Sequence, residues 1–289
     1  MPRGASLTAE WVCLLRALEQ ARPASDRVVD DPLAARFLRP SLYAALRLAT
    51  IRTPLRVAPL DWGALPAGPA ADFVAARHRY IDDALVAALA AGVTQVVVLG
   101  AGYDTRAWRC ADTLGDRLVW EVDFPATQAR KRQILGWQPD LSVDRVRFVP
   151  VDFSHQDFGD RLVSQGFPVG ESTLFVWEGV SMYLDRATVG HTLDTLRQLG
   201  GPGSRLVADF WQRPRGGPWG ALSTAGARLF GVIGEPLRFA LRQDAAPAFL
   251  LDHGFALDEL LDAATLAERY RGRRGLFYAP LFVARASAA

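Results

Sequence analysis

The chain of 289 residues has little cysteine, almost no lysine and no excess of either charge. Its two cysteines, Cys13 and Cys110, are too few for a disulfide framework, a cysteine zinc site or an iron–sulfur cluster held by three thiolates. Basic and acidic residues number 33 and 31, which argues against a nucleic-acid partner. Its apolar runs are far shorter than the roughly 20 residues of a membrane span, and no secretory signal is evident. We expect a soluble, cytoplasmic protein.

Lysine occurs once, at position 131, and the other 32 basic residues are arginine. Any enzyme class that depends on a lysine must therefore use Lys131. The short-chain dehydrogenases need Tyr-x-x-x-Lys, but the residue four before Lys131 is Thr127. No metal site is expected, because no two histidines have the spacing of a ligand pair. The histidines are His78, His155, His191 and His253.

Residues 1–71 are predicted to form a helical cap. Apolar residues between Ser6 and Arg22 recur at steps of three and four, which predicts an amphipathic helix. Asp31 and Pro32 indicate the start of a second helix, with Asp31 as its N-cap. Four prolines between residues 50 and 70 favour irregular structure. The apolar stripe of the first helix consists of Leu7, Trp11, Leu14, Leu15 and Leu18.

Alternating helices and apolar runs follow an alanine-rich helix predicted over Asp72–Ala91. Val96–Leu99 is apolar without alternation, as in a parallel strand that helices cover on both faces. Two final runs, one interrupted by Pro280, predict a terminal antiparallel pair. We expect a doubly wound, mostly parallel α/β sheet of seven strands. The six further predicted strands are Arg117–Val122, Val146–Val151, Thr173–Trp177, Ser204–Phe210, Phe255–Leu260 and Leu276–Ala284.

The loop after Val96–Leu99 contains two glycines one residue apart. Gly100 and Gly102 let the chain turn and let a ligand approach the backbone. A dinucleotide fingerprint would have a third glycine at position 105, but Thr105 stands there. This departure argues against a pyrophosphate and favours a nucleoside without phosphate, for which S-adenosylmethionine (SAM) is the usual candidate. Radical SAM chemistry is excluded by the shortage of cysteine.

We expect one domain over residues 1–289. Residues 72–211 would form the SAM-binding core, and residues 251–289 would return to it as the last strands. The intervening 212–250 segment contains several glycines, two helical stretches and a cluster of arginines. It is predicted to be an inserted helical lid.

Ligands of a doubly wound sheet lie at the carboxyl ends of its strands. Asp123 follows the second strand, 21 residues after Gly102, near the spacing expected for an acid that binds ribose hydroxyls. It could instead cap the helix that begins near Pro125. Asp152 and Phe153 follow the third strand and suit the amino group and face of adenine. An aspartate that caps the next turn fits the pattern of Asp152 equally well.

Charged residues at two further places need partners. Glu178 follows the fourth strand, where either a cationic ligand or an arginine would compensate its charge. Tyr183 comes five residues later. Arg77 and Arg79 lie on the helix before Val96 and point to different faces, so that one of them could grip an amino-acid carboxylate.

Together these motifs resemble the leucine carboxyl methyltransferase family, especially its bacterial SAM-dependent O-methyltransferases of polyketide and other secondary metabolism. The resemblance covers most of the chain and implies the Rossmann-like fold of class I SAM methyltransferases. The helical cap and the 212–250 segment look like the family's substrate cover. The resemblance rests on Asp31-Pro32-Leu33-Ala34, Arg77-x-Arg79-x-x-Asp82-Asp83, Gly100 to Arg106, Glu121-Val122-Asp123, Trp177 to Tyr183 and Gly234-Glu235-Pro236.

The resemblance implies SAM as the cofactor, S-adenosylhomocysteine as its product, and no metal. Position by position, it implies that Arg77 binds the methionine carboxylate, Asp123 the ribose, and Asp152 with Phe153 the adenine. Phe153 departs from the leucine that is common in the family, an apolar exchange. The cofactor-binding residues expected are Arg77, Gly100, Gly102, Asp104, Asp123, Phe124, Asp152, Phe153 and Glu178.

The expected acceptor is a small acidic or phenolic metabolite. A carboxylate is favoured, because it is already ionised at neutral pH and needs no general base. A hydroxyl would need one, for which Glu178, Tyr183 or a histidine brought in by the fold are candidates, Glu178 and Tyr183 in a positioning or a basic role. Tyr183, Arg238 and Arg242 are expected to contact the acceptor, although these arginines fit a solvated face as well. Two alternatives are an NAD(P)-dependent oxidoreductase and a SAM-binding regulatory protein without catalysis.

Overall fold

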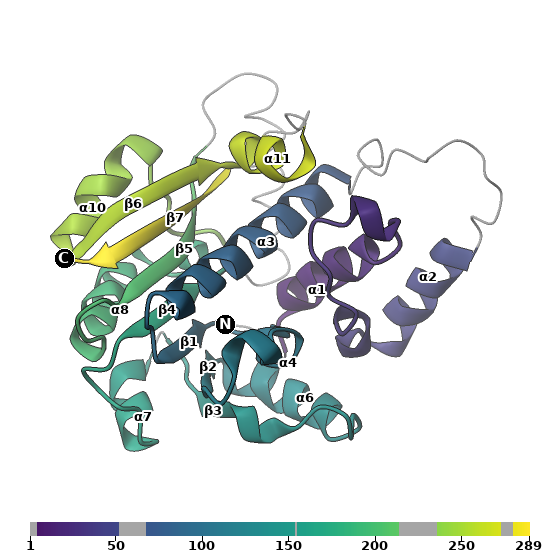
Figure 1. The fold of residues 1–289 in the computed structure, drawn as a ribbon, viewed down its shortest axis with the longest axis horizontal. Coiled ribbons are helices and arrows are strands. Elements are labelled where there is room, and N and C mark those ends of the chain that lie inside the picture. The colour runs from purple at the N-terminus through teal and green to yellow at the C-terminus, as the bar shows by residue number, and fades with distance from the viewer. Residues whose placement is uncertain (1–4, 52–67, 154, 214–235, 273–279) are drawn as a thin grey trace.

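A computed structural model describes residues 5–51, 68–153, 155–213, 236–272 and 280–289 (Figure 1). A seven-stranded sheet forms its centre, in the order β3-β2-β1-β4-β5-β7-β6. The first five strands are parallel, and β7 is antiparallel to both β5 and β6. The predicted mixed α/β sheet with a terminal antiparallel pair is confirmed. The strands are β1 Gln95–Leu99, β2 Val119–Asp123, β3 Val146–Pro150, β4 Thr173–Trp177, β5 Arg205–Trp211, β6 Phe255–Asp262 and β7 Leu281–Ala288.

Helices cover both faces of this sheet. One face lies under α3, α5 and α11, and the other under α7, α8 and α10 (Figure 1). Within the described residues, no helix has the length and apolar character needed to cross a membrane. The helices are α1 Leu7–Glu19, α2 Pro40–Ile51, α3 Gly68–Ala90, α4 Arg106–Arg109, α5 Ala111–Leu114, α6 Pro125–Leu135, α7 Phe158–Ser164, α8 Arg186–Leu199, α10 Ala246–Asp252 and α11 Ala263–Arg271.

The sequence of β1 lacks an alternating pattern because the strand is buried on both faces. Val97 and Leu99 pack into the core beneath α7 and α8, whereas Val96 and Val98 pack into the core beneath α3. Since both faces are apolar, every position of the strand is apolar. β1 is also central, with β2 and β4 as neighbours. Its carboxyl end therefore lies at the middle of the sheet edge where a ligand is expected.

The largest differences from the predicted boundaries concern the last strand and the helix before β1. The last strand begins at Leu281 and continues to Ala288, four residues past the predicted end. The predicted start of that strand, 276–279, lies outside the described residues. The helix before β1 begins at Gly68, earlier than predicted, while most of the stretch predicted as irregular, 52–67, also lies outside them.

The predicted N-terminal helix is confirmed as α1, but only part of its predicted apolar stripe is buried. Leu15 is buried, and Leu14 and Leu18 pack against the core, whereas Leu7 and Trp11 are 45% and 46% exposed and Arg16 is buried. Arg16 can be buried because its Nη1 lies 2.8 Å from Oδ2 of Asp31, which is also fully buried. The predicted second helix is a 3-10 turn, Ala34–Phe37. Its N-terminal amide is bound by the Asp31 carboxylate.

The predicted lid is described only in part, since residues 214–235 lie outside the described residues. Phe239 and Leu241, which follow them, are buried in the same core as Phe210 of β5. Phe249 and Leu250 of α10 pack there as well. This last part of the 212–250 segment is therefore packed against the sheet.

Phe210 supports a testable prediction about this core. Its fully buried ring packs at 5.6 Å from Phe282, 6.4 Å from Phe239 and 6.5 Å from Trp177, measured between ring centroids. We expect Phe210→Ala to lower the free energy of unfolding by about 3–5 kcal/mol, because it leaves a cavity between three elements. Urea unfolding followed by circular dichroism measures this. Val86→Ala, at a 51% exposed helical site, is the control, and a loss no larger than the control's would contradict the prediction.

Candidate functional site

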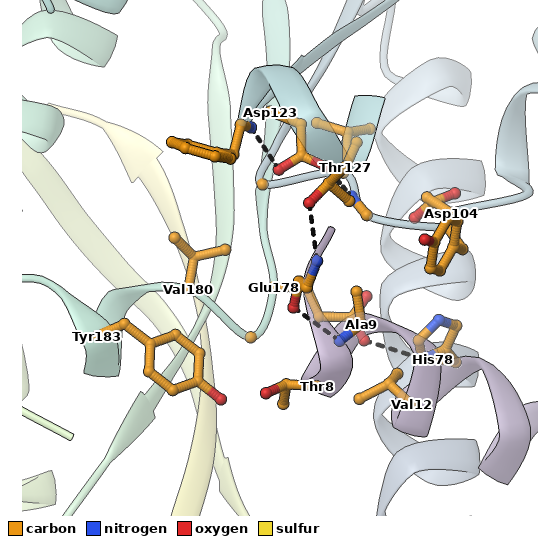
Figure 2. Close-up of a pocket in the computed structure, with 18 of the residues that line it drawn as sticks. Thr8, Ala9, Val12, His78, Asp104, Asp123, Thr127, Glu178, Val180 and Tyr183 are labelled. Atoms are coloured by element: carbon orange, nitrogen blue, oxygen red, sulfur yellow. Dashed lines mark hydrogen bonds and ion pairs between the residues drawn. The ribbon is translucent and has the colours of Figure 1, made fainter. Parts of the chain in front are cut away.

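A hollow of about 1070 Å³, partly continuous with solvent, lies at the carboxyl ends of the central strands (Figure 2). Side chains from the loops after β1, β2 and β4 line it, together with residues of α1 and α3. The predicted strand-end residues and the glycine loop thus share one cavity. The predicted residues that line it are Arg77, Gly100, Gly102, Asp104, Asp123, Phe124, Phe153, Glu178 and Tyr183.

The glycine loop needs its glycines for two reasons. Gly100 and Gly102 have φ angles of 63° and 49°, in the left-handed region that other residues rarely adopt. A Cβ on Gly100 would also lie 2.1 Å from Cγ2 of Val180, which comes from the loop after β4. The floor of the hollow is formed where these two loops meet, and a side chain at Gly100 would force them apart.

Asp123 fastens the loop to β2. Its Oδ2 accepts a hydrogen bond of 2.8 Å from the Gly102 amide, and its Oδ1 accepts one of 2.7 Å from the Phe124 amide. The N-cap of α6 is Phe124, so Asp123 does not occupy the capping position that was the alternative. Its carboxylate lies at the hollow, where a ligand hydroxyl could reach it (Figure 2).

Glu178 lies between two guanidinium groups and a buried imidazole. Its Oε1 is 2.8 Å from Nη2 of Arg77 and 2.8 Å from Nδ1 of His78, while its Oε2 accepts a 3.1 Å hydrogen bond from Arg106. The contacts at Oε1 lack hydrogen-bond angles, and charge attraction holds the one with Arg77. Burial by itself would raise the pKa of Glu178, but His78, Arg77 and Arg106 together hold it well below its ordinary value. Glu178 is therefore a permanent anion and a poor base.

The partner of Arg77 was not predicted. Nη1 of Arg77 is 2.5 Å from Oδ2 of Asp209, and Oδ1 of Asp209 accepts 2.7 Å from the Gly179 amide. Asp209 lies within the apolar run of β5. An acid in such a run is expected to need a buried cationic partner, and this signal could have pointed to Asp209. Arg79, in contrast, is exposed and paired with Asp83. Arg77 is thus the inward-facing member of the Arg-x-Arg motif.

α1 and its N-cap also contribute to the hollow. The Ser6 amide donates to Oγ1 of Thr127 across 3.1 Å, and Nη2 of Arg16 donates to the Tyr103 carbonyl across 2.6 Å. No periodic pattern indicated these contacts, because they join residues that are far apart in sequence. The lining residues that sequence reasoning did not single out include Ser6, Thr8, Ala9, Val12, Arg16, His78, Thr127 and Val180.

Three predicted site residues do not line the hollow. The Asp152 carboxylate binds Nδ1 of His155 at 2.9 Å, and its backbone carbonyl accepts from the amides of His155 and Gln156. Arg242 is exposed, and its Nε donates to Asp244 across 2.8 Å. Arg238 is also exposed, and its amide donates to the Met182 carbonyl. The proposed acceptor contacts of both arginines are therefore not supported.

The order of the sheet, the glycine loop after β1 and the acid after β2 define the Rossmann-like fold of the class I SAM-dependent methyltransferases. The chain belongs to the leucine carboxyl methyltransferase family, whose model matches residues 9–197. The family resemblance inferred from the motifs is thereby confirmed.

Individual relatives agree with this assignment. A Parafrankia protein provisionally named an S-adenosyl-L-methionine-dependent methyltransferase is 33% identical over 274 residues, which cover 93% of this chain and 82% of the relative. Two solved structures share the fold. One is a DUF574 family protein of Streptomyces avermitilis, with a TM-score of 0.59, 13% identity and coverage of 95% and 97% of the two chains. The other, provisionally described as a methyltransferase of Thermobifida fusca, has a TM-score of 0.57, 15% identity and coverage of 94% and 97%.

His78 gives the fold a pH dependence that can be measured. Burial lowers the pKa of His78 to about 4, against the opposing attraction of Glu178. The unfolded chain takes up this proton near pH 6.5, so between about pH 6.5 and 4 the unfolded state binds more protons and the folded state loses stability as the pH falls.

We expect His78→Gln to lack this loss. The free energy of unfolding of the wild type, relative to that of the variant, should fall by about 3 kcal/mol between pH 6.5 and 4. Urea unfolding across this range checks the difference, with exposed His191→Gln as control. A difference that stays constant with pH would show that His78 is not held neutral.

Proposed function

We propose that this protein transfers the methyl group of SAM to a carboxylate oxygen of a small secondary metabolite. Family membership supports the methyl donor, and the site supports the acceptor atom. The observation that carries the acceptor assignment is the position of Glu178 among Arg77, His78 and Arg106. These contacts remove the acidic side chain nearest the methionine end from any role as a base.

The residues of the hollow fit SAM. It lies at the carboxyl ends of parallel strands, where the ligands of doubly wound sheets bind, and Gly100 and Gly102 are part of its lining. Nε of Arg77 is buried without a hydrogen-bond partner, which suits a guanidinium that also binds the methionine carboxylate. Asp123 and Phe124 would contact the ribose, and Phe153 would contact the adenine.

A carboxylate acceptor suits the electrostatics of the site. When bound, SAM supplies a methyl group whose bond to sulfur breaks as the bond to oxygen forms, and the electron pair stays on sulfur. An ionised carboxylate releases no proton in this exchange, whereas an alcohol or phenol needs a base. With its pKa at about 4, His78 is a weak base, and Glu178 is weaker than an ordinary glutamate. The protein would therefore accelerate the transfer by holding the methyl group and the acceptor oxygen in line.

Tyr183 and Thr8 would position the acceptor. Both line the hollow, and their hydroxyl groups lie next to one another in the view of Figure 2. Val180 lies beside Tyr183 over the glycine loop. An acceptor beside them would meet two hydroxyl groups and an apolar wall, which suits a small metabolite with an apolar body.

Asp123→Ala tests the donor half of the proposal. We expect the Kd for S-adenosylhomocysteine to rise at least about tenfold, because a hydrogen bond to a charged group contributes about 1.5–3 kcal/mol. Isothermal titration calorimetry measures it. Asp144→Ala is the control, because it removes an exposed acid that does not line the hollow. Equal affinities for Asp123→Ala and wild type, or no binding by folded wild type, would refute the donor site.

The alkali stability of the product tests the acceptor half. With methyl-labelled SAM and a panel of carboxylic acids and phenols, we expect labelled products that release labelled methanol at alkaline pH, as methyl esters do. We also expect kcat with saturating donor to be flat from pH 6 to 8, since the acceptor is already ionised there. A labelled product that resists alkali would be an ether, and it would overturn the carboxylate assignment while leaving the donor site intact.

A further inference from the structure

Lys131, the single lysine of the chain, is completely buried on α6. Its Nζ donates to both carboxylate oxygens of Glu121, across 2.8 and 2.7 Å, and to the backbone carbonyl of Asp104, across 2.7 Å. A lysine ammonium has three N–H donors, so these contacts use all of them. Neither the methyl-donor contacts proposed above nor the apolar cores account for this arrangement.

The three contacts join three parts of the fold. Lys131 belongs to α6, Glu121 to β2, and Asp104 to the glycine loop. Asp104 lines the hollow, whereas Lys131 and Glu121 do not. The ion pair therefore lies behind the loop, and the bond to the Asp104 carbonyl connects it with the wall of the hollow.

An ion pair alone would not explain a buried lysine here. Replacing a buried pair by apolar residues of similar volume is often neutral or stabilising, because taking two charges out of water is costly. An apolar pair cannot donate to the Asp104 carbonyl, however. The loop is also held by Asp123 at the Gly102 amide, by Arg16 at the Tyr103 carbonyl and by Arg106 at the Asp104 carboxylate. The bond from Lys131 adds a contact at the Asp104 backbone carbonyl, which these three do not bind.

We propose that Lys131 is a positioning residue, which holds the glycine loop in the shape that binds the methyl donor, and that Glu121 keeps the Lys131 ammonium in place. The proposal rests on the proposed function in one respect, namely that the ligand of the loop is SAM. The holding of the loop itself does not depend on that identity.

The charge on Glu121 makes the contact between Lys131 and the glycine loop sensitive to pH. Glu121 faces Lys131 from α6, Asp104 from the glycine loop and Asp123 from its own strand. Burial raises the pKa of Glu121 to about 7, although Lys131 opposes the shift. As the pH falls from 8 to 6, Glu121 gains a proton, its attraction for Lys131 weakens, and the loop is held less firmly.

The first test needs no ligand. The double variant Lys131→Met, Glu121→Leu removes the buried pair without leaving an unpaired charge, so we expect it to fold. Amide hydrogen exchange over residues 100–106, followed by mass spectrometry, should be at least about tenfold faster than in the wild type. Leu250→Ala, in the core at α10, is the control for general loss of stability. Exchange as slow as in the wild type would overturn the proposal.

The second test measures S-adenosylhomocysteine affinity by titration calorimetry. We expect the double variant to bind at least about tenfold more weakly than the wild type. We also expect the wild-type Kd to rise between pH 8 and 6, and Glu121→Gln, which carries no titrating group there, to lack this rise. Should the double variant fail to fold, Glu121→Gln still decides, since an unchanged pH profile in that variant contradicts the proposal.

Failure of the two proposals gives different results. No binding by folded wild type would refute the methyl-donor site, while faster exchange in the double variant would still support the role of Lys131. Tight binding by both wild type and double variant would support the donor site and refute the role of Lys131.

Discussion

The site depends on one buried guanidinium, that of Arg106. It binds Asp82 on α3, Asp104 in the glycine loop and Glu178 at the end of β4. All three carboxylates are at most 12% exposed, so removing the guanidinium would leave uncompensated buried charge, at a cost of about 3–5 kcal/mol. The separation between the two loops that form the hollow is thus set by charge pairing. Apolar packing positions the sheet, and Arg106 positions the site on it.

The sheet could be predicted from sequence because its strands carry local signals. Val96 to Leu99 form an apolar run that is covered on both faces, and β4 repeats this pattern at full burial. The orientation of α1 could not be predicted in the same way. Periodicity treats Arg16 as a surface residue, whereas Asp31 and the Tyr103 carbonyl allow it to be buried. Hydrophobic patterns locate apolar contacts and miss paired charges.

The site was predictable to the extent that strand ends determine it. Asp123 and Glu178 follow their strands directly and line the hollow. The partner of Arg77 was hidden, because Asp209 lies 132 residues away and only the folded sheet brings them together. Arg242 does not line the hollow, and Asp244, two residues on, pairs with it. The position of an arginine in the sequence therefore predicts a ligand contact only when the acid that pairs with it in the fold is known.

The pairing of the arginines also constrains the order of binding in the proposed reaction. Arg16 and Arg77 line the hollow, but Arg16 is paired with Asp31, and Arg77 with Glu178 and Asp209. An acceptor carboxylate therefore finds no uncompensated guanidinium on these two side chains, and the acids around them repel it. A sulfonium already in place would supply an attraction that these two side chains do not, so the proposed reaction favours binding of the donor first. After transfer, the thioether and the ester are both uncharged at the reacting atoms. The attraction between sulfonium and carboxylate is then lost, which weakens the binding of both products.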